Sequence, residues 1–112
     1  MCGIAGFCNL KGDNLANIEK MKARMFHRGP DAGGHFISED GQVVLGHRRL
    51  SIIDLSETGA QPMKSHSGRF VMVFNGEIYN YKKVAKKLLE EGLVDSFKGS
   101  SDTEVLLEAF EH

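Results

Sequence analysis

The chain has 112 residues, enough for one modest domain, and 41% of them are hydrophobic and 26% charged, as in ordinary globular proteins. A formal net charge of -1 gives no reason to expect a nucleic-acid partner, because binding to phosphates needs clustered lysines and arginines. No apolar run approaches the ~18 residues that span a bilayer, and the N-terminus lacks a secretory signal pattern. We therefore expect a cytoplasmic location and no membrane partner.

The cysteines and histidines give no sign of a metal site. Cys2 and Cys8 lie in one apolar segment, and on a single strand they would be about 20 Å apart at ~3.3 Å per residue, too far for a disulfide. At least one thiol is expected to be free, which suits a reducing compartment. The five histidines show no ligand spacing with the cysteines or with each other, so no metal is expected.

The first half of the chain predicts a strand, a helix and a hairpin, in that order. Residues 2–8 are apolar apart from glycines and favour a buried strand. Asn14 can cap a helix that ends at the Gly-Pro pair of 29–30. Strands at 35–38 and 42–50 follow, and the Glu-Asp-Gly sequence between them is typical of a hairpin turn.

The second half predicts a long loop, a strand and two helices. Residues 54–68 lack periodicity, and loops of that length are usually functional. In residues 69–74 both alternating faces of a strand would be apolar, which predicts a strand at the centre of a sheet or between two layers. Asn80 can cap a helix that ends before Gly92. The Ser-Asp-Thr-Glu sequence at 101–104 is a capping box that opens the last helix.

Cys2 is the first candidate for chemistry. By position alone, it is best explained as a small apolar residue at the start of a strand. Removal of Met1, however, would leave a thiol and a free α-amine on the same residue. Because the amine can take the thiol proton, directly or through a water, nucleophile and base would then be combined.

The other candidates also have structural explanations when they are taken singly. Asn75-Gly76 favours a hairpin turn, although the asparagine amide and the glycine N–H could both donate to an oxyanion. Arg49 suits either a strand surface or a bidentate carboxylate clamp. Asp102 is a favourable acid in the first turn of a helix, or a ligand for an ammonium group. The Arg-Gly-Pro-Asp sequence at 28–31 is a turn in any interpretation.

Taken together, these segments are more specific. The chain contains, in order, CGIAGF at its N-terminus, HRGPD at 27–31, GHRRLSIIDLS from Gly46, GAQPM from Gly59, NGEIYNY from Asn75 and SDTEVLL from Ser101. Over essentially its whole length it resembles the class II glutamine amidotransferase domain of glutamine-hydrolysing asparagine synthetases. That domain is one of the N-terminal nucleophile (Ntn) hydrolases.

The resemblance implies a role for each candidate residue. Cys2 would be the nucleophile, and Asn75 with the Gly76 amide would form the oxyanion hole. Arg49 would hold the α-carboxylate of glutamine, and Asp102 its α-ammonium. The residues that would line or assist the same pocket are Leu50, Ile52, Ile53 and Glu77.

The resemblance also implies an α+β fold, the N-terminal portion of a four-layer α/β/β/α sandwich with antiparallel sheets. Residues 1–112 would be the truncated N-terminal part of the glutaminase domain, and the synthetase domain would be absent. The expected partners are glutamine and that C-terminal synthetase domain, and homodimerisation stays open. No cofactor is expected in this chain, since ATP and Mg²⁺ would bind only the missing domain.

The expected reaction is hydrolysis of glutamine to glutamate and ammonia, and two alternatives stay open. The chain could be a non-catalytic fragment or assembly module, because half of a sandwich leaves a sheet edge and an apolar face uncovered. It could also be an Ntn amidohydrolase that acts on a different amide. The residues do not distinguish aspartate from another carboxylate as the ammonia acceptor.

Overall fold

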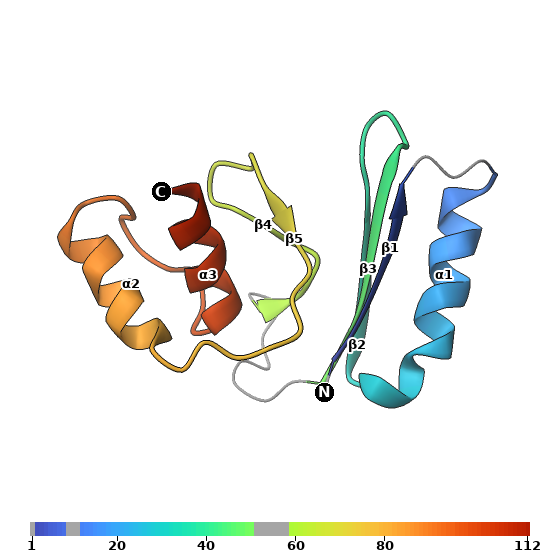
Figure 1. Ribbon diagram of the computed structural model, residues 1–112, viewed down its shortest axis with the longest axis horizontal. Coiled ribbons are helices and arrows are strands. Elements are labelled where there is room, and N and C mark those ends of the chain that lie inside the picture. Colours follow the sequence, from blue (N-terminus) through green and yellow to red (C-terminus); the bar gives the residue numbers. More distant parts are fainter. Residues whose placement is uncertain (1, 9–11, 51–58) are drawn as a thin grey trace. The chain divides into compact units, whose positions relative to one another are not determined.

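The computed structural model describes residues 2–8, 12–50 and 59–112, which form two compact units (Figure 1). The first, here called the sheet unit, comprises Met1–Ser51, Ala60–Pro62 and Val73–Asn75. The second, the helical unit, comprises Ile52–Gly59, Met63–Met72 and Gly76–His112. The chain therefore passes from one unit to the other between two of the residues singled out by the sequence, Asn75 and Gly76.

The sheet unit is built on an antiparallel sheet with the strand order β1-β3-β2. Its strands are β1 (Gly3–Cys8), β2 (Ala32–Ile37) and β3 (Val43–Arg49). In the turn between β2 and β3, the Asp40 carboxylate accepts hydrogen bonds from the Ser38 hydroxyl at 2.7 Å and the Gln42 N–H at 3.0 Å. Gly41 adopts a φ of 70°, a conformation that favours glycine. The predicted hairpin is confirmed, and β3 is the central strand.

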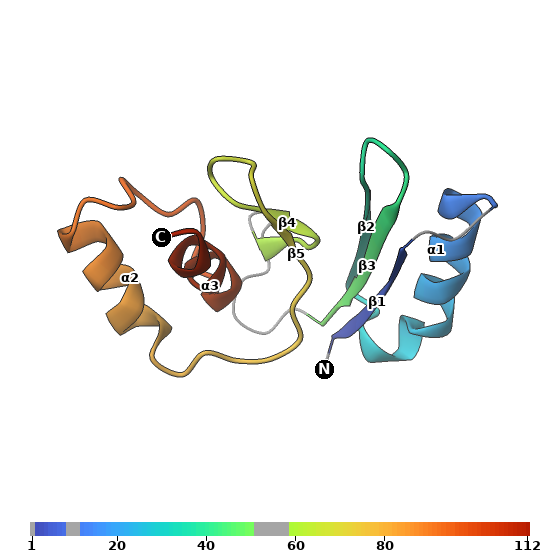
Figure 2. The ribbon, with the colours of Figure 1, turned by 45° about the horizontal axis from the view of Figure 1, so that its top comes forward.

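One face of this sheet is covered by helix α1 (Asn14–Arg24) (Figure 2). Ile18 is fully buried there and lies directly over Gly46 of β3, where an added Cβ would be 2.6 Å from the Ile18 Cδ1 atom. Val44, which shares this face of β3, is also fully buried. Close approach of helix to sheet at Gly46 therefore forms the small core of the sheet unit.

The start and end of α1 differ from the prediction. The capping side chain is Asp13, which accepts the Ala16 N–H at 3.1 Å, and Asn14 is already helical. The Asn14 amide instead donates to the Gly41 carbonyl at 2.8 Å, tying the helix start to the hairpin turn. The helix ends at Arg24, and a 3₁₀ turn, η1 (Phe26–Arg28), carries the chain to the Gly-Pro pair.

The prediction that residues 2–8 form a buried strand is correct for the strand but wrong for its burial. Side chains along β1 alternate between buried or half-buried and exposed positions, and Ile4 is 47% exposed. The reason is that, among the described residues, β1 is an edge strand that pairs with β3 alone, while α1 covers one of its faces. An apolar run alone cannot distinguish such a strand from a central one.

The prediction of a central strand over residues 69–74 is wrong. Only β5 (Val71–Met72) is extended, and it pairs with β4 (Met63–Lys64) in a two-stranded sheet of the helical unit. Both residues of β5 are only half-buried. The strand stops because the Phe74 N–H donates to the side-chain oxygen of Gln61 at 2.6 Å instead of to a neighbouring strand. β4 also interrupts the stretch expected to be a loop, of which residues 54–58 lie outside the described residues.

Two amphipathic helices, α2 (Tyr81–Glu90) and α3 (Asp102–Glu111), form the rest of the helical unit. The predicted cap of α3 is confirmed, because the Ser101 hydroxyl accepts the Glu104 N–H at 3.2 Å. Asn80 does precede α2, but its side chain makes no capping hydrogen bond within the described residues. None of the described helices is long and apolar enough to cross a membrane.

Buried charge organises the helical unit in a way that the sequence did not indicate. Glu104 and Glu108 of α3 are 4% and 1% exposed. Glu104 accepts the backbone N–H groups of Lys98 and Gly99 at 2.8 and 3.0 Å, and its Oε2 lies 2.6 Å from His66 Nε2. Glu108 accepts the His66 N–H at 3.0 Å. These bonds compensate the cost of burying two carboxylates and fasten two loops to α3.

The contact between α1 and β3 gives the first testable prediction. Gly46→Ala should lower the free energy of unfolding by about 1–3 kcal/mol, because the new methyl group collides with Ile18. Ile18→Val removes the colliding Cδ1 and should by itself cost about 0.5–1.5 kcal/mol. In the Gly46→Ala background the same Ile18→Val change should cost less or even stabilise. Urea unfolding of the four proteins measures this coupling, and strictly additive changes would contradict the packing described.

Candidate active site

Cys2 immediately precedes β1, and its thiol lies against the residue that follows β3. The Leu50 N–H donates to Cys2 Sγ at 3.3 Å, and the Leu50 carbonyl oxygen is 3.6 Å from the same sulfur. Both cysteines are free thiols, but Cys2 is half-buried whereas Cys8, at the far end of β1, is exposed. The backbone of Leu50 therefore sets the direction of a partly accessible sulfur.

The Arg-Gly-Pro-Asp turn closes around the same strand end. Arg28 Nε donates to the Cys2 carbonyl at 3.4 Å, and Arg48 Nε donates to the Gly29 carbonyl at 2.9 Å. Only glycine fits at position 29, because a Cβ there would lie 2.4 Å from the Arg48 carbonyl carbon. The predicted turn thus holds the N-terminal cysteine and the end of β3 together.

Arg48 and Arg49 lie on opposite faces of β3, because successive side chains of a strand alternate. Arg48 is on the face covered by α1, and its guanidinium carbon is 4.8 Å from the centroid of the Phe26 ring. Arg49 is on the other face and is 9% exposed, while its backbone carbonyl accepts the Asp31 N–H at 3.0 Å. A buried guanidinium on this face has the charge and the planar geometry to bind a carboxylate.

His47 shares the face of Arg49 and is 1% exposed. Burial lowers the pKa of its imidazole below the ordinary value, and the positive charge of Arg49 lowers it further, while a hydrogen bond with the Phe74 backbone acts in the opposite direction. The ring is therefore neutral at pH 7. Its Nε2 atom is buried and has no hydrogen-bond partner among the described residues.

Asn75 and Gly76 do not form the tight hairpin turn that the pair favours by itself. Asn75 is half-buried and follows Phe74 in irregular backbone of the sheet unit, and Gly76 is exposed at the start of the helical unit. Glu77 is exposed as well. The pair is therefore a junction between the units rather than the loop of a hairpin.

Asp102 is the first residue of α3 and is 6% exposed. Its Oδ2 accepts the Ile78 N–H at 2.9 Å. Through this bond the start of α3 anchors the segment that follows Glu77. The carboxylate thus has a structural partner inside the helical unit in addition to the favourable helix dipole.

The predicted site residues fall into two groups. Cys2, Arg49, Leu50 and Asn75 belong to the sheet unit, whereas Gly76, Glu77 and Asp102 belong to the helical unit. The remaining two, Ile52 and Ile53, lie outside the described residues. Within the sheet unit, Cys2 and Leu50 are in direct contact, and Arg49 precedes Leu50 at the end of β3.

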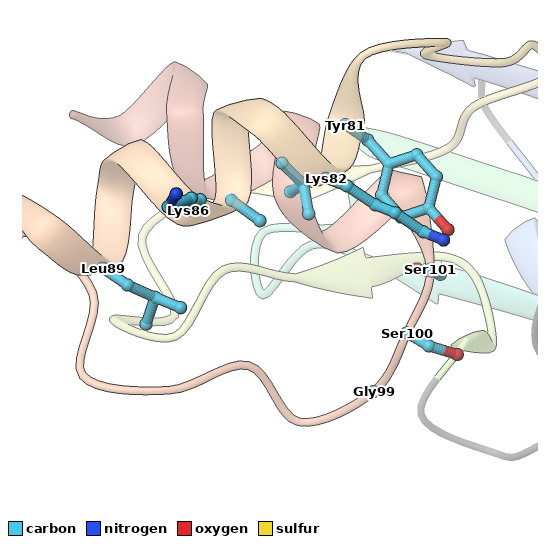
Figure 3. Close-up of a pocket in the computed structure, with 9 residues that line it drawn as sticks. Tyr81, Lys82, Lys86, Leu89, Gly99, Ser100 and Ser101 are labelled. Atoms are coloured by element: carbon cyan, nitrogen blue, oxygen red, sulfur yellow. The ribbon is translucent and has the colours of Figure 1, made fainter.

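The helical unit contains a groove with a volume of about 360 Å³ (Figure 3). Its walls are α2, the segment before α3 and the first turns of α3, and the residues that line it are Tyr81, Lys82, Ala85, Lys86, Leu89, Gly99, Ser100, Ser101 and Val105. The described residues that the sequence predicts to be functional are not among them. Asp102 is next to the lining residue Ser101 in the sequence but does not itself line the groove.

One group of side chains in the described part of the chain has the spacing of a metal site. Ligand atoms of Glu108, Glu111 and His112 lie within 4.8 Å of one another. Both carboxylates are already hydrogen-bonded, Glu108 to the backbone N–H of His66 and Glu111 to the Ser67 hydroxyl. Because these bonds explain why the acids gather, we assign no metal to the group.

Three residues near the predicted site lie in motifs that carry the resemblance but were given no role at the site by the sequence. Arg28 bonds the Cys2 carbonyl, and His47 and Gln61 both bond the backbone of Phe74. For His47 a signal was present, since it lies two residues before Arg49 on a strand and must share its face. No local pattern connects Gln61 with Phe74, which lies 13 residues further along the chain.

Known proteins match this chain over its whole length. The family described as glutamine amidotransferase domain matches residues 1–112. Asparagine synthetase [glutamine-hydrolyzing] 1 of Bacillus subtilis is 41% identical, and the match covers 100% of this chain and 18% of that protein. Asparagine synthetase B of Escherichia coli is 36% identical, over 99% of this chain and 20% of that protein.

A third relative is named as an amidase rather than as a synthetase. Amidase chry2 of Gibberella zeae is 38% identical, with coverage of 100% of this chain and 18% of that protein. The chain thus spans about a fifth of the length of these relatives. The match of the family over all 112 residues accords with the mixed α/β architecture and the antiparallel sheets. The chain belongs to the glutamine amidotransferase domain family.

Proposed function

We propose that this chain is the glutamine-hydrolysing part of an amidotransferase of the asparagine synthetase type, with Cys2 as its nucleophile. The observation that carries the proposal is the position of the thiol. Cys2 is the second residue, it is partly accessible, and its sulfur is oriented by the backbone of Leu50 next to Arg49. The glutamine-hydrolysing synthetases among its relatives support glutamine as the amide.

The proposed mechanism begins once Met1 has been removed. The Cys2 α-amine takes the thiol proton, and the thiolate attacks the side-chain amide carbon of glutamine. The Asn75 amide and the Gly76 N–H donate to the resulting oxyanion. Collapse breaks the C–N bond, ammonia leaves with the proton returned by the amine, and a γ-glutamyl thioester remains. Water then hydrolyses the thioester to glutamate and free thiol.

Glutamine would be recognised through its α-substituents. Arg49 would bind the α-carboxylate, which is consistent with a buried guanidinium on the sheet face that also bears His47. Asp102 would bind the α-ammonium, assisted by Glu77. The backbone and side chains of Leu50, Ile52 and Ile53 would complete the pocket.

The complete domain would be a four-layer α/β/β/α sandwich of the Ntn hydrolase type, with the sheet and α1 supplying one pair of layers. Ammonia would pass to an ATP-dependent synthetase domain, which would hold ATP and Mg²⁺ outside these 112 residues. The chain accounts for 18–20% of the length of the synthetases that it matches, which leaves room for such a domain.

A second candidate function is hydrolysis of a different amide. It is favoured by the likeness to amidase chry2, which is as extensive as the likeness to the synthetases. In both functions water takes the acyl group, so they differ in the amide that is hydrolysed. Steady-state assays with glutamine and with other primary amides separate them, and glutamine should give the highest kcat/KM.

The assignment of the nucleophile predicts that Cys2→Ala abolishes glutamine hydrolysis by the full-length protein. Loss of a covalent nucleophile normally costs several orders of magnitude, so less than ~1% of the activity should remain. Synthesis from added ammonia should be largely retained. Cys8→Ala is the matched control, because Cys8 is a free and exposed thiol at the far end of the strand that Cys2 precedes. Equal losses in the two variants would contradict the assignment.

The two neighbouring arginines provide a test of substrate recognition. Arg49→Lys keeps the charge but loses the bidentate fork, and it should raise KM for glutamine about tenfold or more with a smaller change in kcat. Arg48→Lys, on the opposite face of β3, should leave KM within about twofold of the parent. Measurement of glutaminase kinetics decides the matter. An unchanged KM in Arg49→Lys would show that Arg49 does not bind the substrate.

The proposed base predicts that activity follows the removal of Met1. A molecule that keeps Met1 has its Cys2 nitrogen in an amide bond, which cannot accept a proton. Mass spectrometry of the N-terminus, before and after treatment with methionine aminopeptidase, should show glutaminase activity proportional to the fraction that begins at Cys2. Full activity in a preparation that retains Met1 would require another base.

A further inference from the structure

We propose that His47 and Gln61 position Asn75 for catalysis by fixing the two peptide groups that flank Phe74. This inference rests on the proposed function, because it takes Asn75 to be a donor to the oxyanion. His47 and Gln61 would be positioning residues, since they act on the backbone before Asn75 and need not touch the substrate. Both lie in motifs that carry the resemblance, GHRRLSIIDLS and GAQPM, but the sequence analysis gave neither a role.

The first half of this arrangement is the bond from Phe74 to Gln61. The Phe74 N–H, which belongs to the peptide group of residues 73 and 74, donates to Gln61 Oε1 at 2.6 Å. Gln61 itself lies tightly on the sheet, because a Cβ added at Gly34 would be only 2.3 Å from the Gln61 carbonyl oxygen. Gly34 therefore lets Gln61 reach the segment before Asn75 from a rigid strand.

The second half is the bond between His47 and the Phe74 backbone. This bond favours the protonated ring, so the ring is the donor and the Phe74 carbonyl is the acceptor. The Phe74 carbonyl shares a rigid peptide plane with the N–H of Asn75. Fixing that carbonyl therefore fixes the plane from which Asn75 extends.

His47 and Gln61 both contact the same part of the sheet, where β3 pairs with β2. His47 of the central strand β3 is paired with Gly34 of β2, so the two residues lie side by side on one sheet face. The segment Val73–Asn75 is irregular and is not paired with any strand in the part of the chain that the structure describes. A donor to an oxyanion must be held in place before the reaction, because small displacements of catalytic groups reduce the rate steeply. The buried imidazole and the Gln61 amide supply that restraint.

The experiment uses the full-length protein and measures kcat and KM for glutamine hydrolysis. His47→Leu removes the donor, His47→Asn keeps a side-chain N–H, and Gln61→Met removes the acceptor for Phe74. His35→Leu is the control, because His35 lies on β2 with its side chain on the α1 side, near Lys22 and Glu19. Asn75→Ala is combined with His47→Leu and with Gln61→Met in double-mutant cycles.

We expect His47→Leu and Gln61→Met each to lower kcat at least tenfold, but by no more than the ~10²–10³-fold that losing an oxyanion donor costs. KM for glutamine should stay within about threefold of the parent value. His47→Asn should restore most of the kcat, and His35→Leu should not change it. In the Asn75→Ala background, His47→Leu and Gln61→Met should have no more than about a twofold further effect. Alkylation of Cys2 by iodoacetamide, which needs no oxyanion hole, should proceed at the parent rate in every variant.

The possible failures are distinguishable. An unchanged kcat in Asn75→Ala would refute the proposed function of Asn75. If Asn75→Ala is impaired but His47→Leu and Gln61→Met are not, or if their effects multiply with that of Asn75→Ala, the positioning role is wrong. If His47→Leu proves to be unfolded by circular dichroism, Gln61→Met, whose site is in irregular backbone, decides the outcome by the same criteria.

Discussion

The backbone at the end of β3 serves several segments at once, and the proposed site depends on this shared use. The Arg48 backbone lies in close contact with Gly29, and the Arg49 carbonyl accepts a hydrogen bond from the Asp31 N–H. The Leu50 backbone contacts the Cys2 sulfur. Arg48 and Arg49 are still paired with neighbouring strands, whereas Leu50 lies beyond β3, so its backbone N–H can bond the Cys2 sulfur instead of a strand partner. The requirement for glycine at position 29 follows from that crowding rather than from any need for flexibility.

The alternation of side chains along β3 separates structural from proposed chemical roles. Gly46 and Arg48 face α1, where they make the close helix contact and hold the turn. His47 and Arg49 face the other way, where a neutral imidazole and a guanidinium are both buried. Such polar burial costs stability unless the groups are hydrogen-bonded, so two buried cationic or basic side chains side by side on this strand favour a function for this face.

In the helical unit, buried acidic side chains of α3 hold the neighbouring loops through hydrogen bonds. Two glutamates of α3 are buried, and they are stabilised by the side chain and backbone of His66 and by backbone amides before the helix. The same helix offers Asp102 at its start, where the Ile78 N–H is bound. The acidic residues of α3 therefore determine the path of the chain on both sides of α2, including the segment that follows the proposed oxyanion pair.

The relatives agree on the family and differ in their named reactions. Two synthetases and an amidase match the chain over nearly all of its length at 36–41% identity. A common fold can support several substrates, so the family does not by itself choose among them. The choice would lie in the groups around Arg49 and in the domains that receive the products.

The sequence alone determined the features that depend on neighbouring residues. The hairpin turn follows from Asp40 and Gly41, the start of α3 from Ser101, and the family from the order of short motifs. Each of these is a local pattern, either of hydrogen bonds a few residues apart or of consecutive letters.

The tertiary structure alone decided the features that depend on distant residues. It placed β1 at a sheet edge, ended the strand at Met72, and joined Cys2 to Leu50 across 48 residues and His66 to Glu104 across 38. It also showed that His47 and Gln61 converge on Phe74. Apolar runs and single polar residues do not specify their partners, because burial and hydrogen bonding are settled only when segments far apart in the chain pack together.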